Sequence, residues 1–216
     1  MEGLFIVFEG IDEIALGFQA RLLRDYFWHK NELCHLTSEP SSGPIGSIIT
    51  QAKSGRLLLS GGPHPLDPER ELLDDQLLHL SAADRHDHLF NKINGITKRT
   101  SNGENVICRG YYFGSLANHC FSQETYLMGN MINSRFPDPD LVVYIDYPAE
   151  KPIGYSASDA FSNIYHDKNR LLKVKRNYDE ILENYEGNLL IFDGTTQDVT
   201  LHKQIVTEFE RCKGSL

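Results

Sequence analysis

The sequence has few of the features that mark secreted, membrane or metal-binding proteins. Its four cysteines are widely spaced and form no Cys-x-x-Cys pair, so neither a disulfide scaffold nor a zinc ribbon is expected. No run approaches about 18 consecutive apolar residues, so no transmembrane helix is expected. The first residues carry neither the basic nor the long apolar region of a signal peptide. We therefore expect a cytoplasmic protein with free thiols that does not bind membranes.

Positive charge is also scarce. With 21 basic against 30 acidic residues the formal net charge is -9, which disfavours binding to the phosphates of a nucleic acid. The longest basic cluster, residues 173–176, falls in an amphipathic pattern and is expected to be a solvated helix face. His86 and His88 are two residues apart and would point to different faces of a helix, so we expect no metal site.

Hydrophobic patterning predicts strands that alternate with helices. Short apolar runs, typical of buried strands, are residues 4–9, 33–37, 105–108, 141–146 and 189–192. Helical periodicity covers residues 18–27, a segment from Pro44, and residues 68–93, 115–131, 171–185 and 199–212. The Gly- and Pro-rich residues 54–68 are expected to form a loop.

This alternation predicts an α/β fold, a five-stranded parallel sheet with helices on both faces. The 216 residues show no internal repeat and no linker, so residues 1–216 are expected to form a single domain. In such folds ligands bind at the carboxyl ends of the strands, which makes the loops after the strands the candidate functional segments.

The loop after the first strand has the position of a phosphate-binding loop but lacks its chemistry. A working loop reads G-x-x-x-x-G-K-[ST]: the glycines expose backbone N–H groups, the Lys neutralises the transferred phosphoryl group, and the hydroxyl holds Mg²⁺. Gly10 occupies the first position. At the second Gly, the Lys and the hydroxyl positions the chain carries Ala15, Leu16 and Gly17.

Around this loop the sequence resembles the thymidylate kinases. The segments that carry the resemblance cover essentially the whole chain in family order: residues 8–12 (FEGID) with Gln19 and Ala20, 37–46 (TSEPSSGPIG), 80–88 (LSAADRHDH), 106–119 (VICRGYYFGSLANH) and 139–148 (PDLVVYIDYP). The resemblance implies the P-loop nucleoside-monophosphate kinase architecture with a lid at about residues 149–170. It also implies a homodimer paired through helices. The leucines on several faces of residues 72–90 are compatible with one.

The resemblance also implies a substrate pocket. Its candidate residues are Glu9, Glu39, Pro40, Ser81, Arg85, Arg109 and Asn118. Arg85 is in register with a family arginine that contacts the monophosphate. Ser81 replaces the aromatic residue that stacks on thymine, and Asn118 replaces a pocket tyrosine. Arg109 and the following glycine replace an Asp-Arg pair that serves the phosphate. Lid arginines are also expected, yet residues 136–169 contain no Arg.

These departures define a degenerate phosphate loop (Gly10, Asp12, Glu13, Ala15, Leu16 and Gly17), in which Asp12 matches the family's loop carboxylate. Glu13 stands where small residues normally let the backbone approach phosphate. A carboxylate about 4 Å from a phosphate charge costs roughly 4 kcal/mol at an effective dielectric constant near 20. The charged groups that place and stabilise a transferring phosphoryl group are therefore absent together.

We therefore expect a thymidylate-kinase-like protein without phosphoryl-transfer activity, with no catalytic residue, no cofactor and a remodelled nucleotide-binding or protein-binding role. The alternative is an active dTMP kinase that transfers the γ-phosphate of ATP to dTMP, with Mg²⁺, at an atypical site. A third interpretation is a structural partner protein without a small ligand.

Overall fold

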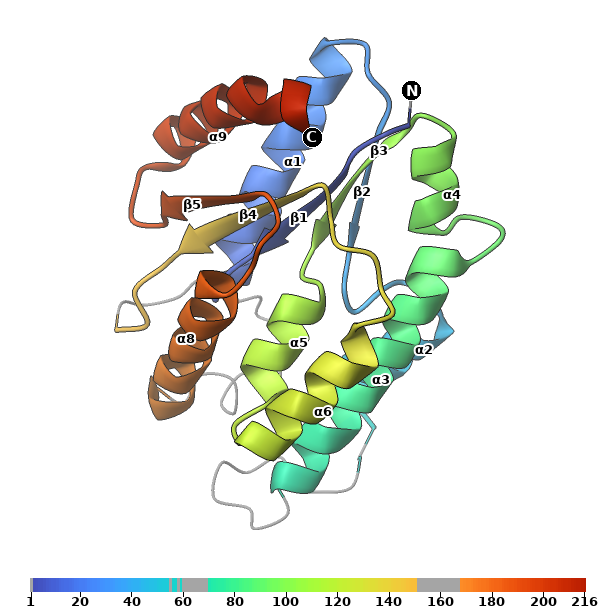
Figure 1. Ribbon diagram of the computed structural model, residues 1–216, viewed down its shortest axis with the longest axis vertical. Helices are drawn as coiled ribbons and strands as arrows, with labels where there is room; N and C mark the ends of the chain where they lie inside the picture. The colour runs from blue at the N-terminus through green and yellow to red at the C-terminus, as the bar shows by residue number, and fades with distance from the viewer. Residues whose placement is uncertain (1, 55, 58, 60–69, 151–167) are drawn as a thin grey trace.

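Strands and helices alternate along the chain of the computed structural model, which describes residues 2–54, 56–57, 59, 70–150 and 168–216 (Figure 1). The strands are β1 (Phe5–Glu9), β2 (Cys34–Ser38), β3 (Asn105–Arg109), β4 (Leu141–Asp146) and β5 (Leu189–Asp193). The helices are α1 (Glu13–His29), α2 (Pro44–Lys53), α3 (Arg70–Phe90), α4 (Ile96–Ser101), α5 (Tyr112–His119), α6 (Gln123–Asn133), α8 (Lys168–Glu183) and α9 (Asp198–Cys212), with a final 3-10 turn, η1 (Lys213–Ser215).

The strands form one sheet in the order β2-β3-β1-β4-β5, and every neighbouring pair is parallel. This confirms the predicted five-stranded parallel sheet. The chain first builds the β2-β3 side of β1 and then crosses to the β4-β5 side. The point where a parallel sheet reverses its winding leaves a crevice outside the carboxyl ends of the strands. The loops after β1, β3 and β4 therefore converge on the candidate site.

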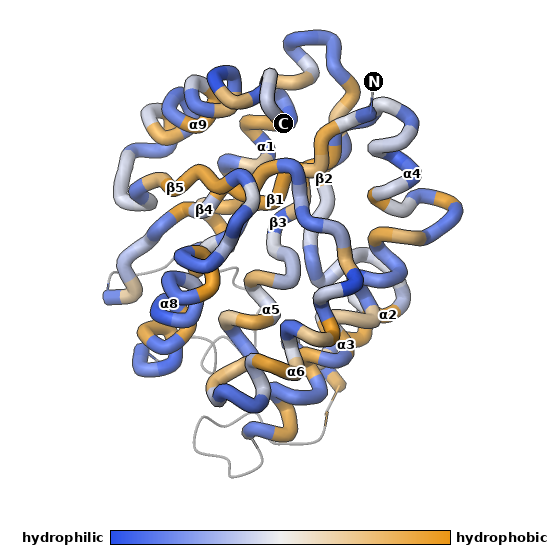
Figure 2. Tube along the Cα trace, in the orientation of Figure 1, coloured by the Kyte–Doolittle hydropathy of each residue, from blue (hydrophilic) through white to orange (hydrophobic). Residues whose placement is uncertain are grey.

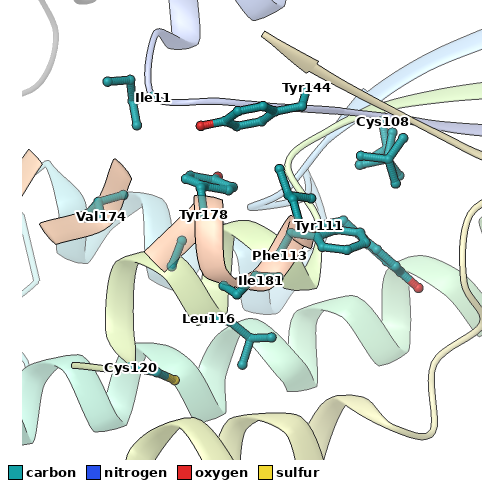
Figure 3. Packing of buried hydrophobic residues seen from close by; sticks show 14 of the residues in the cluster. Ile11, Cys108, Tyr111, Phe113, Leu116, Cys120, Tyr144, Val174, Tyr178 and Ile181 are labelled. Carbon is teal, nitrogen blue, oxygen red and sulfur yellow. The ribbon is translucent and has the colours of Figure 1, made fainter. Parts of the chain in front are cut away.

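The three central strands β1, β3 and β4 are buried on both faces, because helices cover each face of the sheet and side chains alternate between the faces. One face carries Phe5, Val7 and Tyr144 in a cluster that α5 and α8 complete, part of which Figure 3 shows. The other face carries Ile6 and Phe8 in a second cluster with α1 and α9. In Figure 1, α1 and α9 lie on one side of the sheet and α5 and α8 on the other. The central strands are largely apolar in Figure 2, as two-sided burial requires.

Several predicted boundaries differ from the structure. Helix α1 begins at Glu13, before the apolar periodicity at Phe18, because Asp12 caps it there. The predicted helix over residues 115–131 is two helices, since Ser122 forms a capping box that starts α6. Helix α4 was not predicted; its six residues are too short for a clear periodicity.

Two predicted segments lie largely outside the described residues. The loop at 54–68 overlaps the undescribed positions 55, 58 and 60–69, and the lid at 149–170 overlaps 151–167. The four cysteines are free thiols. Among the described helices, none is both long and apolar enough to cross a bilayer.

Candidate functional site

The loop between β1 and α1 is closed by its own side chain. The Asp12 carboxylate oxygen Oδ1 accepts hydrogen bonds from the backbone N–H groups of Ile14 (3.0 Å) and Ala15 (2.9 Å). The Asp12 carbonyl accepts a third, from the Leu16 N–H at 3.0 Å. A phosphate-binding loop turns such N–H groups toward the ligand. Here they are used inside a helix that already begins at Glu13.

The position of the phosphate-binding lysine is part of the hydrophobic core. Leu16 is 5% exposed and packs with Phe8 in the cluster under α1. Its side chain therefore points into the core and away from the crevice at the strand ends. Gly10 matches the first glycine of the phosphate-binding motif, and the backbone requires a glycine at this position. Its φ is +152°, and a Cβ there would lie 2.6 Å from the Ile145 carbonyl oxygen.

Arg109, the last residue of β3, lies across the first turn of α1. Its Nη1 is 3.4 Å from the Glu13 carbonyl oxygen, and a Cβ on Gly17 would lie 3.0 Å from the same nitrogen. Arg109 thus occupies the space into which a metal-holding hydroxyl at position 17 would project. In the described ranges no carboxylate forms an ion pair with this guanidinium.

Arg85, the residue implied to contact a monophosphate, is fully buried, with 0% of its surface exposed. Its Nη2 donates to Glu39 Oε2 at 2.7 Å and to Ser115 Oγ at 2.8 Å. The rings of Tyr111 and Phe136 lie 5.1 and 5.6 Å from its guanidinium carbon. The cis peptide bond Glu39–Pro40 belongs to the same region. Arg85 is therefore engaged by the protein's own groups and offers no surface to a ligand.

Glu9 ends β1 beneath the loop and is 1% exposed. Its Oε1 accepts from the Tyr111 N–H at 2.6 Å and the Gly114 N–H at 3.3 Å, and Tyr178 donates to its Oε2 at 2.8 Å. Burial outweighs these hydrogen bonds and, with the nearby Glu39 charge, raises the pKa of Glu9 to about 8. Glu9 is therefore mostly a neutral carboxylic acid at pH 7.

The two predicted nucleobase positions lie on facing helices, and both are half-buried. Ser81 is on α3 and Asn118 on α5. The Asn118 side-chain amide donates to the Gly114 carbonyl oxygen at 2.9 Å, one turn back on its own helix.

A buried charged cluster beside these positions was not predicted from the sequence. Asp74 of α3 accepts two hydrogen bonds from Arg170 of α8, at 3.0 and 2.8 Å, and one from His119 of α5 at 3.0 Å. Burial alone would raise the pKa of Asp74, but the His119 and Arg170 contacts lower it to about 2. The sequence feature that could have indicated this cluster is the position of Asp74 between Leu73 and Leu77, on the apolar face of a predicted helix.

A separate cavity of about 360 Å³ opens at the carboxyl ends of β4 and β5. It is lined by Asp146, Pro148, Ala149, Glu150, Leu172, Lys175, Asp193 and Thr195. Lys175 is paired with Asp146 at 3.1 Å and also with Asp179. The lining therefore carries more negative than positive charge, which disfavours a phosphate there.

The residues at the first loop do not fit a phosphate-bound metal ion. Gly17 offers no oxygen ligand, and Arg109 brings a cation to the position of the family's aspartate. In the part of the chain that the structure describes, no group of three His, Cys, Asp or Glu side chains could hold a metal. No chemical step is therefore assigned to a metal here.

The sheet order and the crevice after β1 define a parallel α/β protein with the P-loop nucleotide-kinase architecture. The family model for thymidylate kinase matches residues 8–205, so the chain belongs to the thymidylate kinase family.

Relatives of known sequence support this assignment. The "Probable thymidylate kinase" of Thermococcus kodakarensis is 30% identical over 217 residues, covering 98% of this chain and 99% of that protein. A relative from Treponema pallidum, also named for thymidylate kinase, is 33% identical over 149 residues. That match covers 68% of this chain and 62% of the relative, less than two thirds of its length. The solved structure of thymidylate kinase from Candida albicans has a TM-score of 0.74 at 22% identity, covering 98% and 93% of the two chains, and shows the shared fold.

The Asp74–Arg170 pair predicts a large, position-specific loss of stability. The change Arg170→Met removes the guanidinium that donates two hydrogen bonds to the buried Asp74 carboxylate, which should lower the free energy of unfolding by about 3–5 kcal/mol. The matched control is Arg211→Met, since Arg211 pairs with Glu208 on the surface. That change should cost less than about 1 kcal/mol. Urea denaturation at pH 7 measures both.

The pH dependence of the same pair has a definite sign. Because the pKa of Asp74 is lowered, its contribution is complete above the ordinary carboxyl value and is lost as pH falls toward about 2. The difference between wild type and Arg170→Met should therefore shrink in acid. Equal losses for Arg170→Met and Arg211→Met at pH 7 would contradict this account.

Proposed function

We propose that this member of the thymidylate kinase family does not transfer phosphoryl groups and serves as a binding protein built on the kinase fold. The observation that carries the proposal is the closed first loop. The N–H groups of Ile14, Ala15 and Leu16 are bonded to Asp12, so they cannot cradle a phosphate unless the first turn of α1 unwinds. Such unwinding would sacrifice a helix cap worth about 1 kcal/mol in addition to the helical bonds.

The charges around the crevice support the same proposal. Phosphoryl transfer depends on cations placed beside the phosphates, and a single arginine finger contributes about 10³–10⁵ in rate. Leu16 replaces the loop lysine, and Arg85 is committed to Glu39 at 2.7 Å. The one cation left near the loop, among the described residues, is Arg109, and it stands where the family has a carboxylate. Several contributions are thus absent at once, and such contributions act as a unit.

The second candidate function is an active dTMP kinase with an unusual site. The names of the relatives favour it, as does the survival of Asp12, Glu39, Pro40 and Arg85 in family register. This candidate needs ATP and Mg²⁺, and it requires that α1 unwinds at its start when the nucleotide binds. Enzyme turnover separates the two candidates directly.

A coupled assay of ADP release with dTMP, ATP and Mg²⁺ tests the proposal. Turnover should stay far below about 1 per second, the lower end for kinases. The same result is expected for the combined variant Glu13→Gly, Ala15→Gly, Leu16→Lys and Gly17→Ser. This variant restores the loop sequence but not the Asp-Arg pair at Arg109, the stacking ring at Ser81 or a lid arginine.

The control for this assay is a working thymidylate kinase under identical conditions. Turnover of about 1 per second or faster in the wild-type chain would establish the second candidate. The same rate in the four-residue variant alone would show that the loop is the only defect, against the account of several joint losses.

We further propose that the chain forms a homodimer through α3 and α6. The two helices are neighbours in the fold (Figure 1). Large apolar side chains on them are exposed: Leu72 by 54%, Leu127 by 61% and Met131 by 70%. Leu127 and Met131 lie one turn apart on α6, and exposed apolar side chains so placed are typical of an interface.

Light scattering tests the dimer. The wild type should show twice the chain mass, and the double variant Leu127→Glu, Met131→Glu should show the single-chain mass. Val199→Glu is the control, because Val199 is 58% exposed but lies on α9. A single-chain mass for the wild type at high concentration would refute the dimer.

A further inference from the structure

Glu9 joins three elements beneath the first loop. Its carboxyl group lies at the end of β1, accepts from two backbone N–H groups at the start of α5, and is covered by the Tyr178 hydroxyl of α8. Gly114 makes this contact possible, because a Cβ there would lie 3.1 Å from both Glu9 Oε2 and the Tyr178 oxygen. The packing at this junction is therefore built around the carboxyl group.

The described groups that face Glu9 supply hydrogen bonds, and no close cation is among them. The loop after β2 contributes the like charge of Glu39, and β3 contributes the buried Cys108 thiol. From β4 comes Tyr144, whose ring lies 5.3 Å from that of Tyr178 (Figure 3). The Tyr144 hydroxyl has no hydrogen-bond partner among the described residues.

The charged groups farther out do not compensate Glu9 either. From α1, the Glu13 carboxylate acts on Tyr178. From α8, Lys175 lies over the Tyr144 ring at 5.9 Å but is paired with Asp146 and Asp179. Within the described part of the chain, an ionised Glu9 would therefore be a buried charge without a counter-ion, which is costly.

We propose that the protonation state of the Glu9 carboxyl group controls the packing of α8, and we call this arrangement the latch. When the carboxyl group is neutral, α8 stays packed against the carboxyl end of β1. When it is ionised, the middle of α8 separates from the end of β1. In the neutral form the Glu9 carboxyl O–H donates to the Tyr178 oxygen, and both groups remain shielded from water. In the ionised form the Tyr178 hydroxyl donates to the Glu9 carboxylate instead, but the buried negative charge favours an open conformation in which water solvates it.

The element that opens is α8 rather than α5, because the two helices meet the carboxylate differently. The start of α5 presents backbone N–H groups and the positive end of a helix dipole, both of which stabilise the anion. Helix α8 presents one hydroxyl on an apolar ring, which mainly excludes water. Loss of the α8 contacts therefore lets water solvate the Glu9 carboxylate, whereas loss of the α5 contacts would remove the groups that stabilise it.

The direction with pH follows from the raised pKa of Glu9. The closed state is most stable below the ordinary carboxyl value near 4.5 and weakens as pH rises to about 8. Above about 8 both states are ionised and no further change is expected. Within this window the opening equilibrium should rise by up to about tenfold per pH unit.

Hydrogen exchange of the full chain at pH 5.5 and 8.0, corrected for intrinsic rates, tests the latch. Protection of amides in α8 should fall by more than about tenfold between these values, while amides in α1 and α9 keep theirs. Glu9→Gln should abolish the change, because the amide cannot ionise. The matched control Glu13→Gln removes a nearby exposed carboxylate and should keep the wild-type response.

Tyr178→Phe serves as a second variant should Glu9→Gln fail to fold. It removes a donor that favours the ionised form but keeps Glu9, so the pH response must persist. The latch is overturned by an unchanged α8 response in Glu9→Gln, by its loss in Tyr178→Phe, or by an equal fall in protection across α1, α8 and α9, which would indicate global destabilisation.

Discussion

The hydrogen bonds from the Ile14 and Ala15 N–H groups to the Asp12 carboxylate determine the shape of the loop that follows β1. They start α1 at Glu13, so the residues that form an open loop in a phosphate-binding protein are helical here. Once the helix starts there, Leu16 must face the core and position 17 must face β3. The glycine at 17 leaves room for the Arg109 guanidinium, since a Cβ there would lie only 3.0 Å from its Nη1. The departures from the family motif are thus one coherent packing solution rather than separate losses.

A second feature of the described residues is that three cations, unlike Arg109, are paired with carboxylates of the chain itself. Arg85 is bound to Glu39, Arg170 to Asp74, and Lys175 to Asp146. In a phosphoryl-transfer site such cations face the substrate and stabilise developing charge. Here the first two pairs are buried and connect α3 to the loop after β2 and to α8. The same charges that would serve catalysis therefore contribute to holding the helices in place.

The sequence predicted the sheet well because two-sided burial leaves continuous apolar runs, such as residues 141–146. The sequence also shows that residues 10–17 depart from the phosphate-binding motif, because that motif is short and strict. It missed the start of α1, since a cap at Asp12 is a matter of local hydrogen bonding rather than periodicity. It also missed Asp74 with Arg170, and Glu9 with Tyr178, because such pairs are 96 and 169 residues apart in the chain. The hydrophobic periodicity of one helix does not indicate which side chain of another element will pair with a polar residue on it.

Amide chemical shifts of residues 13–17, followed by NMR while ATP and Mg²⁺ are added, test the central claim most directly. If the Asp12 cap holds, the N–H groups of Ile14, Ala15 and Leu16 stay bonded within the helix, and their shifts should remain unchanged up to millimolar nucleotide. Saturable shifts confined to these amides at micromolar nucleotide would contradict the account. They would mean that the first turn of α1 unwinds to cradle phosphate and that the kinase site assembles on binding.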